Sequence, residues 1–125
     1  MTGNGKFSDD NNIAEQAYAA MLRSPHAHAI LKNIDTSVTA SMPGVLLVLT
    51  GRDWQNKGLP PLQNNPIPSA KTDPRLFGPS GKQPNVREQF PLPLERIHLV
   101  GEAIAMVVAD TANQALEATE KIKVS

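Results

Sequence analysis

The stretch GEAIAMVVADTANQALEATEKI, residues 101–122, decides the fold class of this chain. Ala103–Ala109 is an uninterrupted apolar run behind a glycine, and a short apolar run bounded by turn residues is typical of a buried strand. Directly after it, Thr111 and Gln114 form a capping-box pattern. Apolar residues then recur at helical spacing, which predicts a helix over Thr111–Lys121 packed on the sheet. A strand that leads straight into a helix indicates a small α+β domain.

Three further elements are predicted from local patterns. Val45–Thr50, VLLVLT, follows a Pro-Gly turn and reads as a second buried strand. Ala29–Asp35 alternates acceptably as a strand, and Thr36–Met42 is expected to form a short helix that ends at Pro43. Together with Ala103–Ala109, these elements predict a mixed sheet with one main C-terminal helix.

The segment before Arg23 is ambiguous. Asn12–Arg23 is rich in alanine and would be assigned to a helix on propensity alone. Ala17–Arg23 can equally be a strand that places Tyr18, Ala20 and Leu22 on one face. The local sequence leaves both interpretations open.

Proline divides the chain. Gly58–Pro93 holds 9 of the 11 prolines, and proline blocks both helices and central strands. We therefore expect a long irregular insertion within a single domain that spans residues 1–125. Trp54 and Phe77 either anchor this proline-rich arm to the domain or bind a partner.

Composition excludes several classes of protein. Net charge is zero and the basic residues are scattered, whereas nucleic-acid binders carry a basic patch. The absence of cysteine excludes disulfides, thiol nucleophiles and Cys-ligated iron–sulfur clusters on this chain. No apolar run approaches the length of about 20 residues that a membrane helix needs, and the N-terminus has no secretory h-region. We expect a cytoplasmic protein.

The most conspicuous string is Arg23-Ser24-Pro25-His26-Ala27-His28. Two histidines at i,i+2 on an extended chain point to the same side, as a metal site requires, and His98 is the remaining imidazole. The competing interpretation is a tight turn in which the imidazoles bond to main chain. A catalytic zinc needs three protein ligands, so we predict no metal ligands here.

Other candidates are weaker. Ser24, a histidine and Asp35 supply the residue types of a hydrolase triad, but no nucleophile-elbow pattern surrounds the serine. Gly3-Asn4-Gly5 lacks the third glycine and the preceding strand of a dinucleotide loop. Glu102 is either a general base or part of a turn or bulge at a strand start. We predict no catalytic and no cofactor-binding residues on this chain.

Four strings, in order, resemble one family. RSPHAHAILKNID (23–35) is similar to a stretch in the large, molybdopterin-binding chain of the xanthine dehydrogenase/aldehyde oxidase family, above all its aerobic carbon monoxide dehydrogenase branch. The others are the opening TGNGKF with Asp9-Asp10, PGVLLVLTGRD (43–53) and VGEAIAMVVA (100–109). Two residues depart from the family pattern: Ile30 replaces a usual arginine, and Ala103 replaces a usual proline.

The resemblance implies an α/β hammerhead domain, with Ala17–Arg23 as a strand paired near Ala29–Asp35. It places the molybdopterin-type cofactor in later large-subunit domains that are absent here. It places iron–sulfur clusters and FAD on partner chains or domains. The chain then reads as a fragment or one piece of a split large subunit.

We therefore expect a structural and assembly domain of a molybdenum hydroxylase-type oxidoreductase that is inactive alone. Its partners would be the remaining large-subunit domains and the iron–sulfur and FAD subunits. The alternative is a stand-alone interaction module that uses the proline-rich arm. We also expect the isolated chain to form a homo-oligomer through edge strands or the arm, because zero net charge opposes association weakly.

Overall fold

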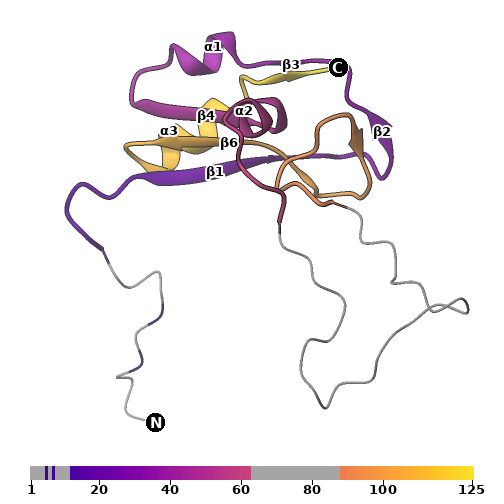
Figure 1. Cartoon of the computed structure of the whole chain (residues 1–125). Coiled ribbons are helices and arrows are strands. Elements are labelled where there is room, and N and C mark those ends of the chain that lie inside the picture. Colours follow the sequence, from indigo (N-terminus) through magenta and orange to yellow (C-terminus); the bar gives the residue numbers. More distant parts are fainter. Residues whose placement is uncertain (1–4, 6, 8–11, 63–87) are drawn as a thin grey trace, which may run out of the picture.

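Strand β6 runs through the middle of the domain, with the other elements arranged around it (Figure 1). The computed structural model describes residues 5, 7, 12–62 and 88–125. The elements are β1 (Tyr18–Arg23), β2 (Ala29–Ile30), β3 (Ile34–Asp35), α1 (Ser37–Ala40), β4 (Val45–Thr50), α2 (Gly51–Asn56), β5 (Arg96–Ile97), β6 (Ala103–Ala109), α3 (Ala112–Thr119) and β7 (Lys123–Val124). This architecture confirms the α+β class.

The main sheet has three strands in the order β1-β6-β4. Met106 at the middle of β6 is paired with Met21 on one side and with Leu49 on the other. Both pairings are antiparallel, as are those of the two-stranded β2-β5 and β3-β7 sheets. A mixed sheet was expected, and among the described residues the ladders are antiparallel instead.

Helix α3 covers one face of the main sheet. Ala105 and Val107 of β6 and Ala118 of α3 have no exposed surface, and Ile122 joins them in the core. Small side chains on both elements let the helix lie close to the strand. The Thr111 hydroxyl accepts a hydrogen bond from the Gln114 amide, so the predicted N-terminus of this helix is confirmed.

The ambiguous segment is a strand, but its partner differs from the expected one. β1 pairs along its whole length with β6, not with residues 29–35. Residues 29–35 in turn form two short strands that pair with β5 and β7. The break arises because Leu31 donates to Glu95 O while Lys32 donates to Ser125 O, so the chain changes partner between these two residues.

Two short elements were not predicted. α2 begins at Gly51, and its capping box is complete, because the Thr50 hydroxyl accepts from the Asp53 amide while the Asp53 carboxylate accepts from the Thr50 amide. β5 comprises only two residues and exists through its pairing with β2. The expected helix at α1 is confirmed, and the buried Thr39 hydroxyl ties it to α3 by donating to Ala118 O.

The core of the proline-rich arm, residues 63–87 with Phe77, lies outside the described residues. At its described ends, Leu62 and Gln89 form an isolated antiparallel bridge. The Trp54 indole donates to Pro60 O at 3.1 Å, so this tryptophan holds the start of the arm against α2.

Gly51 marks a point where two segments touch through their backbones. A Cβ at this position would lie 2.3 Å from Pro93 O and 2.9 Å from Leu92 O. We expect Gly51→Ala to lower the free energy of unfolding by about 2 kcal/mol, because a rigid backbone cannot yield as a side chain can. Urea unfolding measures the change. Gly5→Ala, where nothing lies within 4 Å, should change it by less than about 0.5 kcal/mol, and equal losses in both variants would contradict the packing argument.

Asp35 begins the turn into α1. Its Oδ1 accepts hydrogen bonds from the Ser37 hydroxyl at 2.6 Å and from the Ser37 amide at 3.0 Å. These two bonds, followed by the charge of Lys123 across the β3-β7 pair, lower the pKa of Asp35 below its ordinary value of 3.8. A lowered carboxyl pKa stabilises the folded state above the ordinary value, and that contribution is lost as the pH falls through the folded-state pKa.

Ser37→Ala should raise the pKa of Asp35 back toward 3.8, because the strongest of the bonds to its carboxylate is removed. A carbon-13 NMR titration of the Asp35 carboxyl group measures this. Ser41→Ala is the control, since that hydroxyl donates to the Val38 carbonyl oxygen. An unchanged Asp35 titration in Ser37→Ala would contradict the proposed cause.

Candidate functional site

Two of the strings that carry the family resemblance meet in space, although 78 residues separate them. The Ser24 amide donates to Glu102 O at 2.9 Å, and the Gly101 amide donates to Ser24 O at 2.8 Å. The Arg23 guanidinium adds a third bond to Gly101 O at 2.8 Å. We call this arrangement, residues 23–26 against residues 98–102, the loop clasp.

Gly101 and Glu102 shape the second half of the clasp. Gly101 has a φ of +83°, in the left-handed region that glycine tolerates best. The Glu102 carboxylate accepts from the His98 amide at 2.6 Å and lies 3.7 Å from the His98 imidazole Nδ1. The Glu102 amide donates to Leu99 O, which closes the turn. Of the two interpretations of Glu102, its bonds therefore support the turn at a strand start.

A bulge follows directly. β1 and β6 slip register between Leu22, which pairs with Ala105, and Arg23, which pairs with Ala103. Ile104 is the extra residue on β6, and its side chain is buried. The bulge turns the start of β6 toward the loop that carries Ser24.

Ser24 is buried and forms a turn within its own loop. Its hydroxyl donates to His26 O and accepts from the His26 amide, both at 3.0 Å. These bonds occupy both hydrogen-bonding functions of the hydroxyl, as in a serine-stabilised turn. The Asp35 carboxylate accepts from the Ser37 hydroxyl instead, so Ser24, a histidine and Asp35 do not form a catalytic triad.

The histidines are placed at the surface. His26 and His28 are exposed in the loop after β1, and His98 is half-exposed beside Glu102. In the described part of the chain, no three His, Asp or Glu side chains come together as metal ligands would. Of Gly3-Asn4-Gly5 only Gly5 is described, and nothing lies within 4 Å of its Cβ position.

An apolar pocket of about 260 Å³ lies next to the loop clasp. Its walls come from the end of β1, the start of β6, the β2-β5 pair and the C-terminal residues around β7. They are mostly aliphatic: Leu22, Ala29, Ile30, Leu31, Ile97, Ile104, Ile122 and Val124. Arg23, Ser24 and His26 border it, but Arg23 and Ser24 are already bonded to main chain. Such a lining suits apolar side chains, and it does not fit the phosphate and pterin of a molybdopterin cofactor.

Sequence reasoning did not find the Arg23–Gly101 bond or the pocket. Neither has a local signal, because each joins segments far apart in the chain. The α2 capping box did have one, the Thr-x-x-Asp spacing of Thr50 and Asp53.

In the described residues, no helix combines the length and apolar composition needed to cross a bilayer.

Comparison with known proteins shows which proteins share this domain. The profile described as "Aldehyde oxidase and xanthine dehydrogenase, a/b hammerhead domain" matches residues 2–125. The chain is 49% identical over 53 residues, 42% of its length, to the nicotine 6-hydroxylase large subunit of Paenarthrobacter nicotinovorans. It is 31% identical over 98% of its length to the carbon monoxide dehydrogenase large chain of Afipia carboxidovorans. These matches cover 6% and 13% of the two relatives.

Solved structures agree. Quinoline 2-oxidoreductase from Pseudomonas putida 86 superimposes with a TM-score of 0.76 at 30% identity, over 99% of this chain and 14% of that one. The fold is thus that of a domain found in the large chains of molybdenum hydroxylase-type oxidoreductases. The chain belongs to the aldehyde oxidase and xanthine dehydrogenase family and forms its α/β hammerhead domain.

The clasp gives a prediction for stability. Glu102→Ala removes a charged acceptor from the His98 amide, and the side chain of Glu102 is only 24% exposed. We expect the free energy of unfolding to fall by about 1 kcal/mol, measured by urea unfolding at neutral pH. Glu95→Ala, at an exposed position a few residues earlier, should be nearly silent. A silent Glu102→Ala would show that the carboxylate does not hold the turn.

Proposed function

We propose that this chain is a structural and assembly domain of a molybdenum hydroxylase-type large subunit and is not catalytic by itself. The family membership and the coverage of relatives support this role. The chain spans between 7% and 14% of the relatives and solved chains that it matches over nearly its full length. The chemistry would then belong to the remainder of the large subunit.

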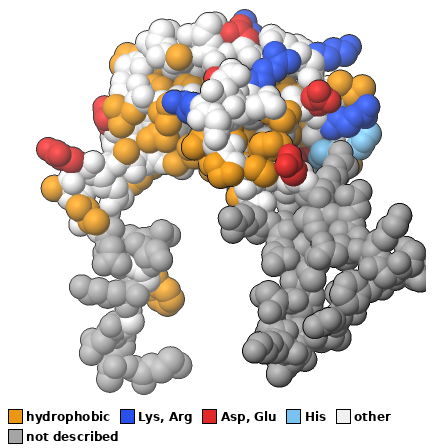
Figure 2. All heavy atoms as spheres, in the orientation of Figure 1, with side chains coloured by type: hydrophobic (Ala, Val, Ile, Leu, Met, Phe, Trp, Pro, Cys, Tyr) orange, Lys and Arg blue, Asp and Glu red, His pale blue; other side chains and the backbone are white. Residues whose placement is uncertain are grey.

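The distribution of large apolar side chains supports an assembly role. Among the described residues, seven larger aliphatic side chains are buried: Leu31, Leu49, Leu92, Ile97, Ile104, Val107 and Ile122. Thirteen large apolar side chains are exposed: Phe7, Ile13, Met21, Ile30, Val38, Leu46, Leu47, Leu59, Leu62, Leu99, Val100, Leu116 and Val124. Leu46 and Leu47, and likewise Leu99 and Val100, are neighbours in the sequence, and Figure 2 shows hydrophobic side chains gathered along the lower border of the domain. Contiguous apolar surface of this kind marks an interface with other protein.

The same division, with structure in this chain and chemistry in the rest of the enzyme, applies to the cofactors. This chain has no cysteine to hold an iron–sulfur cluster, and its pocket is lined by aliphatic side chains. We propose that the molybdopterin-type cofactor binds in the remaining large-subunit domains, and that iron–sulfur clusters and FAD bind in partner chains or domains. The residues of this chain would contribute to positioning those parts, through surfaces such as the loop clasp, rather than to the reaction.

Co-expression tests the proposal. A reading frame that encodes the rest of a large subunit is sought beside the gene, and its product is expressed together with the tagged chain. We expect the two polypeptides to copurify through affinity and size-exclusion steps, and the chain alone to show no oxidation of aldehydes, purines or carbon monoxide with an artificial electron acceptor. An unrelated polypeptide serves as the copurification control.

Turnover by the metal-free chain would refute the proposal. Absence of any such neighbouring reading frame would instead favour the stand-alone interaction module.

A further inference from the structure

The two outer strands of the main sheet, β1 and β4, differ in whether their free edges are protected from pairing with another strand. At β4, the amides at both ends are occupied, because Val45 donates to Met42 O and Thr50 donates to the Asp53 carboxylate. β4 also carries a bulge between Val45 and Leu47, which interrupts its regular edge. Bulges and occupied backbone groups are devices that keep another strand from pairing.

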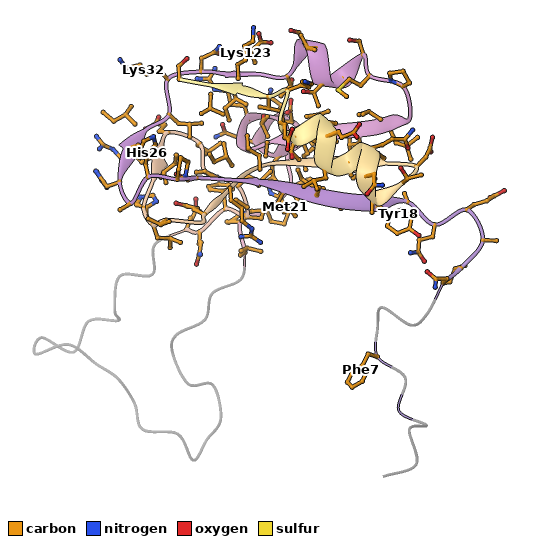
Figure 3. The ribbon with its side chains drawn as sticks, turned by 180° about the vertical axis from the view of Figure 1, so that it is seen from behind. Phe7, Tyr18, Met21, His26, Lys32 and Lys123 are labelled. Carbon is orange, nitrogen blue, oxygen red and sulfur yellow. The ribbon has the colours of Figure 1, made fainter. Side chains whose placement is uncertain are left out.

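β1 has none of these devices. Its six residues, YAAMLR, contain no proline, glycine or lysine, and the bulge in the β1-β6 pair lies on the β6 side. Its one charged side chain, Arg23, bonds to Gly101 O of its own chain. In the part of the chain that the structure describes, β1 pairs with β6 on one side and no strand lies on the other. Figure 3 shows this strand, with Tyr18 and Met21, along the outer border of the domain.

We propose that β1 pairs antiparallel with β1 of a second copy, joining two three-stranded sheets into one across a two-fold axis at Ala20. An unblocked strand edge presents unpaired backbone groups on which another extended strand can pair, and the sequence of β1 is self-complementary in this register. This inference concerns the 125-residue chain itself and does not depend on the proposed function.

The register follows from the side chains. With Ala20 opposite Ala20 of the second copy, Tyr18 lies opposite Leu22, which is an aromatic–aliphatic pair on the α3 face. On the other face, Met21 lies opposite the small Ala19, so a large side chain meets a small one. Arg23 falls beyond the paired segment, so the two arginines are not forced together. Opposite residues share a face in both copies, and both α3 helices therefore lie on the same side of the joined sheet.

Helix α3 lies in the right place to extend this contact. It packs over β1 and β6. Strands are about 4.8 Å apart, so a helix centred between β1 and β6 would lie ~10 Å from its symmetry mate, within the usual range for packed helices. The joined dimer would therefore bring helix against helix as well as strand against strand.

Leu116 provides the apolar side chain for that helix contact. The Gln114 side chain lies against Gly44, beside the start of β4. Leu116 is about 200° further around the helix, on the flank toward β1. It is 59% exposed in the single chain and would become covered when the two α3 helices pack against each other.

Light scattering on the full chain across a wide range of concentration tests the pairing. We expect a mass of about twice 13.5 kDa at high concentration and dissociation on dilution. Met21→Lys should weaken the dimer at least about tenfold, because the two new charges lie diagonally across the seam. Leu47→Lys is the matched control, since Leu47 is also 41% exposed but lies on β4. Thermal unfolding verifies that both variants remain folded.

Cross-linking tests the register. The chain has no cysteine, so Ala19→Cys/Met21→Cys introduces pairs that face each other across the seam and should give a disulfide-linked dimer on mild oxidation. Leu46→Cys/Leu47→Cys, two exposed positions on β4, should not. A chain that stays monomeric throughout would overturn the proposal. So would a dimer that survives Met21→Lys and fails to cross-link through β1, because the contact would then lie elsewhere.

Discussion

The close contact between β6 and α3 is the interaction on which the rest of the domain depends. Ala105 and Val107 of the strand pack with Ala118 of the helix in one cluster, and Ala109 of the strand and Ala115 of the helix are buried as well. Because four of these five side chains are alanine, backbones approach closely and little volume is left unfilled. The same strand pairs with β1 and β4, so loss of this contact would release both outer strands together.

A second constraint joins the two ends of the sequence. The β3-β7 pair and the bonds of Lys32 and Asn33 with Ser125 hold residues 32–35 to the C-terminal segment. The loop clasp does the same for residues 23–26 and the turn before β6. Nearly all of these bonds use main-chain groups, so they depend little on which side chains these segments carry.

Local patterns predicted the elements whose stability is local. The apolar runs of β4 and β6, the helix after Thr111 and the short helix before Pro43 all have their signals within a few residues. β1 could not be settled in this way, because its alanines favour a helix and its strand conformation comes from pairing with residues 103–109. The division of residues 29–35 into two strands was missed for the same reason, since both partners lie more than 60 residues away. At the candidate site, the turn interpretation of Glu102 had a local basis, since its partner His98 is only four residues away, but the bond from Arg23 to Gly101 depends on the tertiary fold.

The core side chains are small, while many of the larger apolar side chains are exposed at the surface. An alanine-rich contact aligns strand and helix well, but each alanine buries little area, and hydrophobic stabilisation scales with the area removed from water. The larger side chains that would add most to a core, such as Leu46, Leu47 and Leu116, are instead at the surface. A domain built in this way has a well-defined internal geometry and only a modest internal driving force. Its remaining apolar area can add stability only when another protein surface covers it, so folding and association are expected to be coupled.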